Sequence, residues 1–292
     1  LSFSAGHLLE VRYGLSNQTA LAWLRRHFKH YALAVLIGLP MFLVLFALIW
    51  YVGAYWWLVA AVGFFIVSVV LAQLGPVLIL PLFHKIEPLR DDELGQRMQR
   101  LSEGTGLAIE GVYRMRMSEE TKKVNAMLAG IGGTRRVIMG DTLLEQFSPD
   151  EIEVIFAHEI GHHVYRHIRK LIIAGAAMSL LGFFVCDRGL AAWLGISDFS
   201  TTPMPVYALP ALMFMLTAFA LVFEPLQNIM SRRFERQCDR YAVAHTGMRE
   251  AYRTSYRKLA KINKADPSPN PVEVFLFHSH PPIAERLSFA DE

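Results

Sequence analysis

The residues with the clearest chemical potential are two histidines and a glutamate in the stretch His158-Glu159-Ile160-Gly161-His162. Positions four apart lie on the same face of an α-helix, so the two imidazoles can bind one metal ion. Glu159 stands between them, where a carboxylate can take a proton from a water molecule that the metal activates. The spacing therefore predicts one catalytic zinc ion held by His158 and His162, with Glu159 as the general base.

A catalytic zinc ion usually has three protein ligands and keeps one position for water, so a third ligand must come from elsewhere in the chain. We predict Glu235 for this role. Asp239, one helical turn later, could then accept a hydrogen bond from a ligand histidine. His163 and His167 are nearer competitors, but on an ideal helix both point away from the metal-binding face, and we expect them to be surface histidines. Taken alone, Glu235 could equally be a solvated carboxylate.

Strong helix signals surround the motif. Residues 148–151 read Ser-Pro-Asp-Glu, which supplies an N-cap, a proline at the first helical position and a glutamate three residues after the cap. Apolar residues at helical spacing then give the helix a buried side: Val154, Ile155, Ala157 and Ile160. The helical pattern continues through residue 170, so one helix could carry the site and run on into the apolar segment at 171–186.

The polar region before this helix combines helical and extended signals. Residues 91–103 read as a helix that ends at Gly104 and Gly106. Strand-like segments at 112–117, 122–127 and 136–139, with a glycine-rich turn at 130–133, predict a small antiparallel sheet.

Composition points to a lipid bilayer. Hydrophobic residues make up 53% of the chain and charged residues 19%, compared with roughly 45–50% and about 25% in soluble domains. Residues 31–83 contain no Asp, Glu, Lys or Arg. As one helix this stretch would reach roughly 80 Å at about 1.5 Å per residue, whereas a hydrocarbon core is about 30 Å thick. It must therefore fold back on itself, and Gly53 lies where it divides most naturally.

We expect membrane spans at about 31–50 and 55–80, and two more built on the apolar segments at 171–186 and 205–223. Basic residues gather at the same ends of these four spans, while the opposite loops hold only Arg188. By the positive-inside rule, the N-terminal, middle polar and C-terminal regions are cytoplasmic. The predicted order is a membrane-surface segment at 1–30, a transmembrane hairpin at 31–83, a catalytic part at 84–170, two spans at 171–230 and a second catalytic part at 231–292.

Several classes of partner and site are disfavoured. A formal net charge of +3, without a basic run interleaved with aromatic residues, argues against nucleic acid as a partner. Cys186 and Cys238 have no CxxC spacing, so we predict buried thiols rather than a disulfide framework or a cysteine zinc site. The first residue is leucine, which indicates a processed or trimmed N-terminus.

The order of these motifs resembles the integral-membrane gluzincin family of zinc metalloproteases, which contains the type I CAAX prenyl protease and the heat-shock protease HtpX. The resemblance extends over nearly the whole chain, and the segment at 10–19 favours the CAAX prenyl protease branch. The segments that carry it are residues 10–19, 81–84, 88–89, 125–126, 141–144, 158–162, 231–239 and 279–282, together with Arg286.

The resemblance implies that Glu235 is the third zinc ligand and that Asp239 supports the site. It further implies that Asn125 and His280 lie beside the bound peptide and stabilise the tetrahedral intermediate, with Arg286 organising the last motif. The fold it implies is a mainly α membrane protein with about four transmembrane helices. A cytoplasmic, zincin-like α+β catalytic domain would carry the small antiparallel sheet.

We therefore predict a membrane-embedded zinc metalloendopeptidase. Its partners would be the bilayer and peptide or membrane-protein substrates, cleaved either in protein quality control or in CAAX-type processing of lipid-modified proteins. The alternatives are an inactive membrane scaffold with a structural zinc ion, and a transporter. An inactive scaffold has no need of Glu159, and a chain without zinc would favour the transporter.

Overall fold

The computed structural model describes residues 2–107, 109–129, 135–197, 199, 200, 202 and 204–292. The glycine-rich turn predicted at 130–133 lies outside these residues. The chain divides into two compact units. One contains residues 1–26, 73–167 and 227–292, and the other contains residues 27–72 and 168–226.

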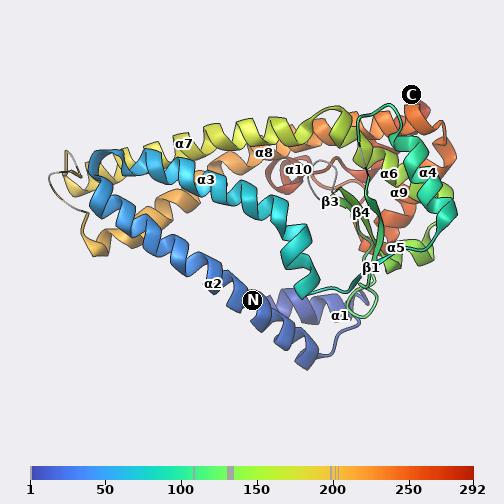
Figure 1. The fold of residues 1–292 in the computed structure, drawn as a ribbon, viewed down its shortest axis with the longest axis horizontal. Helices are drawn as coiled ribbons and strands as arrows, with labels where there is room; N and C mark the ends of the chain where they lie inside the picture. The colour runs from blue at the N-terminus through green and yellow to red at the C-terminus, as the bar shows by residue number, and fades with distance from the viewer. Residues whose placement is uncertain (1, 108, 130–134, 198, 201, 203) are drawn as a thin grey trace. The chain divides into compact units, whose positions relative to one another are not determined.

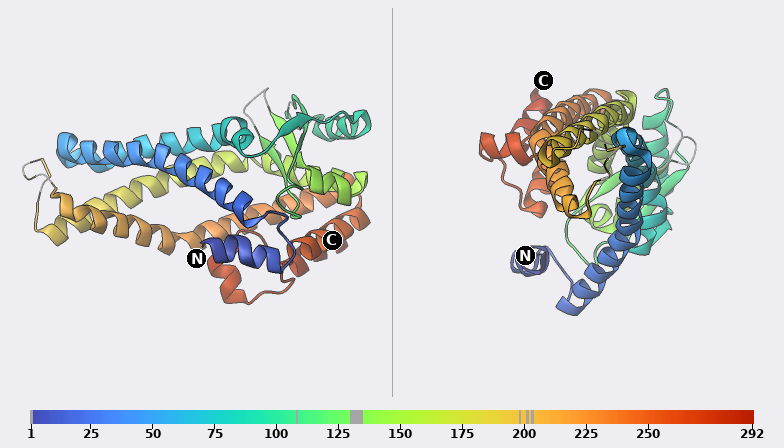
Figure 2. Two further views of the ribbon diagram at one scale, coloured as in Figure 1. Left: turned by 90° about the horizontal axis from the view of Figure 1, so that it is seen from below. Right: turned by 90° about the vertical axis from the view of Figure 1, so that its left-hand side faces the viewer.

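Long helices build the unit at 27–72 and 168–226 (Figure 1): α2 (Ala20–Val52), α3 (Trp56–Leu74), α7 (His167–Leu194) and α8 (Leu209–Thr246). Within this unit α7 and α8 run alongside one another, whereas α2 meets α3 at the turn that joins them and diverges from it toward its own N-terminus (Figure 1 and Figure 2). Their facing side chains form an apolar core in which Ile49, Trp56 and Leu212 are fully buried. The Trp56 indole Nε1 donates to Oδ1 of the buried Asp187 at 2.6 Å, so the polar edge of this core ring is satisfied.

The turn between α2 and α3 explains how the charge-free stretch folds back. A short 3₁₀ turn, Gly53–Tyr55, joins the two helices. Gly53 has φ of 68°, in the left-handed region, and a Cβ there would lie 2.9 Å from Cβ of Ser200. Both the backbone and the available space therefore require glycine. The helix break predicted near Gly53 is present.

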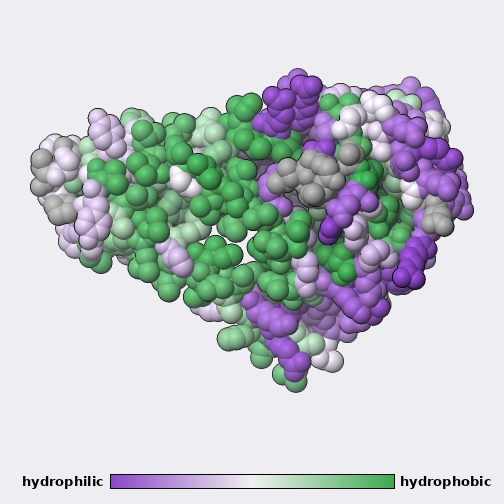
Figure 3. All heavy atoms as spheres, in the orientation of Figure 1, coloured by the Kyte–Doolittle hydropathy of each residue, from purple (hydrophilic) through white to green (hydrophobic). Residues whose placement is uncertain are grey.

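Three helical stretches of the described chain are long and apolar enough to cross a membrane: Ala20–Leu82, His167–Leu194 and Val206–Thr246. The first of them contains both α2 and α3. Large apolar side chains point outward from these helices, among them Leu36, Ile173 and Phe214 at 70%, 70% and 72% exposure. Figure 3 shows hydrophobic residues gathered over this part of the surface. Soluble monomers rarely expose apolar patches beyond a few hundred Å², so this surface is suited to lipid.

The other unit contains a four-stranded sheet in the order β1-β2-β4-β3. Its strands are β1 (Ile86–Pro88), β2 (Gly111–Met115), β3 (Ala126–Ala129) and β4 (Arg136–Gly140). The outer pairs are antiparallel, but β2 and β4 are parallel, with Val112 opposite Val137. The prediction of a purely antiparallel sheet is therefore wrong, and the sheet is mixed. Residues 137–140 are all buried, so burial favours β4 at the centre and leaves β3 at an edge.

Helices cover this sheet and share one apolar core with it: α4 (Asp92–Ser102), α5 (Asp141–Gln146), α6 (Pro149–Val164), α9 (Arg249–Asn263) and the C-terminal part of α8. Two short helices follow, α10 (Pro271–Phe277) and α11 (Ile283–Ser288). At the N-terminus a π-helical turn, Ser4–Leu9, leads into α1 (Glu10–Arg12), and Ser16 then forms an antiparallel bridge with Thr121. Short turns at Gly75–Ile79, Leu80–Leu82 and Phe289–Asp291 complete the unit.

The predicted run of one continuous helix from 149 into the apolar segment at 171–186 is wrong. Helix α6 ends at Val164 and α7 begins at His167. Between them Arg166 adopts φ of 56°, a left-handed conformation that ends an α-helix. The break changes the direction of the chain immediately before His167.

Candidate metal centre

The start of α6 fixes where its histidines lie. Ser148 and Glu151 form a reciprocal capping box: Ser148 Oγ accepts from the Glu151 amide at 3.3 Å, and Glu151 Oε2 accepts from the Ser148 amide at 2.8 Å. Val154, Ala157 and Ile160 are fully buried and turn one face of the helix into the core. A capped start and a single buried face set the rotation of α6, and with it the direction of the motif histidines.

Glu235, on α8, faces both histidines of the motif. Its Oε2 lies 3.2 Å from Nε2 of His158, and its Oε1 lies 3.3 Å from Nε2 of His162. The side chain is only 7% exposed, and Oε2 accepts no well-formed hydrogen bond from the described residues. The structure therefore brings the three predicted ligands together, although Glu235 lies 73 positions after His162 and 77 positions after His158 in the sequence.

These distances are those expected of a zinc site. In tetrahedral coordination with bonds of about 2.0–2.2 Å, neighbouring ligand atoms lie roughly 3.3 Å apart. The two Nε2 atoms meet this distance from the Glu235 oxygens. A divalent cation between them would also satisfy the buried Oε2, which otherwise carries negative charge without a good donor. Two imidazoles and one carboxylate are a common ligand set of catalytic zinc.

Cys238 is the alternative third donor. Its Sγ and one ligand atom from each of His158 and His162 all lie within 4.8 Å of one another. Burial, together with the nearby carboxylates Glu235 and Asp239, raises the pKa of the Cys238 thiol. Because zinc binds the thiolate, this environment disfavours a cysteine ligand. The carboxylate of Glu235 is the better donor on distance and on charge.

Asp239 lies one turn beyond Glu235 on α8 and is fully buried. Its Oδ1 lies 2.9 Å from Nδ1 of His158. Arg286 donates to both carboxylate oxygens, from Nε at 2.8 Å and from a terminal nitrogen at 2.7 Å. Burial acts to raise the pKa of Asp239, but Arg286 and His158 outweigh it and lower the pKa to about 2. The ionised carboxylate can accept the Nδ1 proton of His158, which leaves Nε2 free to bind a metal.

Tyr256, on α9, completes this network and was not among the predicted residues. Its hydroxyl donates to Asp239 Oδ1 at 2.9 Å and accepts from Arg286 at 2.8 Å. The Arg286 guanidinium also lies over the Tyr256 ring, 4.3 Å from the centroid. The one sequence signal was a tyrosine on the apolar side of a helix, whose hydroxyl needs a partner once buried.

A cavity of about 210 Å³ gathers most of the predicted site residues. Those in its lining are Asn125, His158, Glu159, Glu235, His280 and Arg286. Glu159 is half-buried, and the loss of water around its carboxyl raises its pKa. A carboxyl group whose pKa is raised toward neutrality is a better proton acceptor and donor in a reaction near pH 7.

Two further residues in the lining of the cavity, His280 and Asn125, come from a loop and from the start of the sheet edge. His280 is 60% exposed, and its Nε2 lies 3.5 Å from Oε2 of Glu235. Asn125 is exposed and directly precedes β3, the edge strand. Its backbone carbonyl accepts from the Gly140 amide at 2.9 Å, which ties the residue to β4. The two residues that the resemblance places beside a substrate therefore line the cavity that also contains Glu159.

The two neighbouring histidines have different surroundings. His163 is half-buried, and its Nδ1 lies 2.8 Å from the Arg135 guanidinium. His167 is only 1% exposed, and its Nδ1 lies 3.1 Å from Nδ1 of His162. The expectation of a surface histidine is therefore wrong for His167. The left-handed turn at Arg166 brings the ring back toward α6, which an uninterrupted helix would not do.

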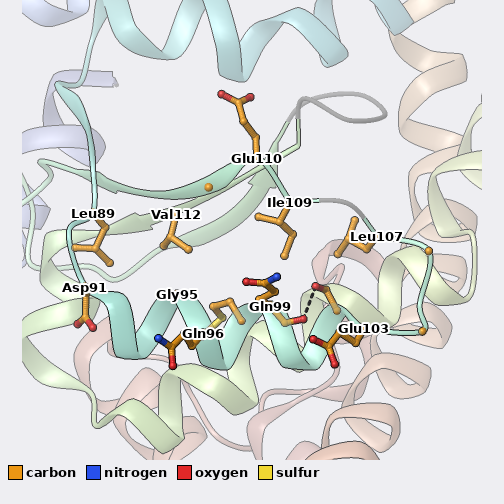
Figure 4. A pocket seen from close by; sticks show the side chains of 15 residues that line it. Leu89, Asp91, Gly95, Gln96, Gln99, Glu103, Leu107, Ile109, Glu110 and Val112 are labelled. Atoms are coloured by element: carbon orange, nitrogen blue, oxygen red, sulfur yellow. Dashed lines mark hydrogen bonds between the residues drawn. The ribbon is translucent and has the colours of Figure 1, made fainter.

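A larger open groove, of about 860 Å³, lies between α4 and the segment from Leu107 to Val112 (Figure 4). Its lining includes neither histidine nor cysteine among the described residues. Asp91 caps α4 by accepting from the Leu94 amide at 2.9 Å, and Glu110, which points away from α4 in Figure 4, pairs with Arg136. The carboxylates of Asp91 and Glu110 thus serve local structure, and the smaller cavity, which holds the motif residues, is the better candidate for chemistry.

Gly161 permits α6 and α8 to approach closely. A Cβ at this position would lie 3.1 Å from Cα of Cys238, which is backbone and cannot rotate away. We expect Gly161→Ala to force the helices apart, to lower the free energy of unfolding by about 1–3 kcal/mol and to reduce zinc binding. Thermal unfolding in detergent and zinc content per chain measure these effects.

Gly95→Ala is the matched control, because Gly95 is also helical and a Cβ there would have no neighbour within 4 Å. Alanine in a helix interior is favoured over glycine by roughly 0.5–1 kcal/mol, so this variant should equal or exceed the wild-type stability. Wild-type stability and zinc content in the Gly161→Ala protein would contradict the close-approach argument.

Comparison with known proteins agrees with this geometry. Residues 88–292 match peptidase family M48, and residues 5–85 match the family described as CAAX prenyl protease N-terminal, five membrane helices. The chain is 30% identical to an uncharacterized metalloprotease, YhfN, of Bacillus subtilis over 98% of this chain and 68% of the relative. It is 29% identical to a CAAX prenyl protease 1 homolog of Arabidopsis thaliana, over 97% of this chain and 67% of the relative.

A crystal structure of Ste24p from S. mikatae has the same fold, with a TM-score of 0.85 and 24% sequence identity over 100% of this chain and 71% of that one. The prediction of a CAAX prenyl protease-like metalloprotease is confirmed. The family match covers the capped helix α6, the Glu235 segment of α8 and the network around Arg286. The chain belongs to peptidase family M48 and is a membrane metalloprotease.

Proposed function

We propose that the protein hydrolyses peptide bonds with one zinc ion held by His158, His162 and Glu235. The observation that carries this proposal is the approach of the two Glu235 oxygens to the two Nε2 atoms, at 3.2 and 3.3 Å. When bound there, zinc would lower the pKa of a water molecule and polarise the carbonyl of the peptide bond to be cleaved.

The chain's own residues supply the remaining steps. Glu159 takes the proton of the attacking water and returns it to the leaving amine. His280 and Asn125 donate hydrogen bonds to the oxygen on which negative charge develops. Asp239 and Arg286 act through His158: they hold its ring so that Nε2 faces the metal position.

The substrate would bind in extended form along β3. This strand pairs with β4 on one side and comes last in the strand order, and no described strand pairs with its other edge, where backbone donors and acceptors can pair with a peptide. Asn125 directly precedes the strand and lines the cavity that contains Glu159. Backbone pairing gives affinity with limited demands on substrate sequence, as a peptidase that accepts several proteins requires.

We further propose that the chain crosses the bilayer four times, with a hairpin at 31–83 and two spans at 171–230. The surface segment at 1–30 and the catalytic parts at 84–170 and 231–292 would lie on the cytoplasmic side. The clustering of basic residues at one end of all four spans supports this orientation. Labelling of a cysteine introduced at the exposed Lys122 by a membrane-impermeant reagent outside intact cells would contradict it.

For the substrate class we propose membrane-associated proteins that carry a lipid-modified C-terminal segment. The match of residues 5–85 to the CAAX prenyl protease N-terminal family supports this choice over general quality control. We expect a farnesylated C-terminal peptide to be cleaved faster than its unmodified form in the same detergent. A preference of about 1.4 kcal/mol would already give a tenfold ratio of kcat/KM. Equal rates on the two peptides would favour quality control, and loss of cleavage by the chelated protein would still identify a metalloprotease.

A further inference from the structure

His167 is buried beside a proposed zinc ligand but does not reach the metal position itself. Its Nδ1 lies 3.1 Å from Nδ1 of His162, and its Nε2 lies 3.0 Å from Oε1 of Gln237. Gln237 stands on α8, two residues after Glu235 and two before Asp239. His162 on α6, His167 at the start of α7 and Gln237 on α8 therefore form a line of hydrogen bonds.

The direction of the protons in this line follows from the acceptor at its end. Oε1 of Gln237 is a carbonyl oxygen and can only accept, so Nε2 of His167 must donate to it. In a neutral imidazole the other ring nitrogen is then an acceptor, and Nδ1 of His167 accepts from Nδ1 of His162. His162 therefore carries its proton on Nδ1, and its Nε2 has the free lone pair that faces Glu235 at 3.3 Å.

The position of the His167 ring is well determined by its neighbours. It stacks on Phe234 with ring centroids 4.1 Å apart and planes 11° apart, and on Tyr165 with centroids 5.7 Å apart. Sγ of Cys238 lies 3.6 Å from its Nδ1. The left-handed turn at Arg166 directs the chain into this slot. A ring packed on two aromatic side chains and buried to 99% has little freedom to rotate away from His162.

We propose that His167 is a positioning residue which, together with Gln237, holds His162 in the tautomer and orientation that bind zinc. It would serve His162 as Asp239 serves His158, so that each ligand histidine has a separate partner on its second nitrogen. This inference rests on the proposed zinc site. The partner of His158 is a negatively charged carboxylate, whereas the imidazole of His167 and the amide of Gln237 are both neutral. The partners of His162 therefore add no charge to the site.

The test uses the full-length protein in detergent and measures zinc affinity by competition with a chelator. His167→Phe keeps a ring that can stack on Phe234 but removes both nitrogens. His167→Asn loses the stacking but can place an amide oxygen near the position of Nδ1. Partners on the second nitrogen of a ligand histidine affect metal affinity by about 10–100-fold. We expect His167→Phe to weaken zinc binding by that factor and His167→Asn to recover most of it.

His163→Phe is the matched control, because His163 is a neighbouring histidine whose Nδ1 faces Arg135 instead of a ligand. Its zinc affinity should stay within about twofold of wild type, well below the 10–100-fold expected of a partner to a ligand. Gln237→Leu removes the terminal acceptor without touching His167 and should also weaken zinc binding. This variant keeps the inference testable should His167→Phe fail to fold, which far-UV circular dichroism of the metal-free protein would reveal.

The outcomes separate this inference from the proposed function. A wild-type protein that binds no zinc would overturn both. Wild-type zinc affinity in folded His167→Phe or Gln237→Leu protein would overturn the role of His167 alone. Equal weakening in His167→Phe and His167→Asn would also overturn it, because the loss would then follow the ring packing and not the acceptor at Nδ1.

Discussion

Replacing Glu159 by glutamine is expected to lower the rate of peptide hydrolysis by about 10²–10⁴-fold, the usual contribution of a positioned general acid–base. The reason is local: Glu159 lines the cavity beside the proposed zinc ligands His158 and Glu235, and its pKa is raised by burial. Glutamine keeps the size of the side chain but cannot carry a proton between water and amine. Because Glu159 is not a proposed ligand, zinc content should remain at the wild-type value. Single-turnover cleavage and metal analysis of the same preparation measure both effects.

Glu153→Gln provides the control for this variant. Glu153 lies on the same helix, but its carboxylate pairs with Arg97 at 3.1 Å and is not in the lining of the cavity. Hydrolysis by Glu153→Gln should therefore remain near the wild-type rate. Cleavage by Glu159→Gln at more than about a tenth of the wild-type rate would be too fast for loss of a general base, and it would remove Glu159 from the mechanism.

The part of the site that depends on local signals could be predicted from the sequence. The cap at Ser148 and the apolar spacing after it define α6, and the spacing of four residues then places His158 and His162 on one face. The charge-free stretch likewise predicted a hairpin, and the turn at Gly53 is present. In each case the determining interactions lie within one or two helical turns of the residues concerned.

Features that depend on long-range packing could not be predicted from local pattern. Nothing near Glu235 distinguishes it from a solvated carboxylate, and it was chosen through the need for a third ligand and a family resemblance. Tyr256 acquires its role only because α9 packs beside α8. The parallel pairing of β2 with β4 was missed, because which strand becomes central depends on burial in the whole unit.

The break at Arg166 illustrates the same limit at a single residue. A left-handed arginine has no sequence signal, because the conformation is disfavoured for that residue type and is held by the surrounding structure. A continuous helix was therefore the natural prediction, and with it a surface position for His167. The break brings His167 next to His162, so that His167 is a candidate partner of the proposed zinc ligand and not a surface residue.

Removing the Arg286 side chain is expected to have the largest effect on stability. Arg286→Met would leave the carboxylate of Asp239, which is fully buried, without the guanidinium that donates to both of its oxygens. Breaking a buried ion pair by removing one partner typically costs about 3–5 kcal/mol, because the remaining charge is uncompensated. The loss should persist in the metal-free protein, since the pair does not require zinc. Thermal unfolding in detergent, with and without a chelator, measures it.

Arg240→Met is the appropriate comparison, because Arg240 follows Asp239 in the sequence but pairs with Glu292 at the surface, with both side chains about half exposed. Exposed pairs contribute about 0–1 kcal/mol, so this variant should unfold close to the wild-type temperature.

Adding Asp239→Asn to Arg286→Met should restore part of the lost stability, because it removes the uncompensated buried charge. Zinc binding should stay weak in the double variant, because His158 loses its ionised partner. Equal destabilisation by Arg286→Met and Arg240→Met would mean that Asp239 does not depend on Arg286 for its charge. The network behind His158 would then have to be assigned to Tyr256 and the backbone alone.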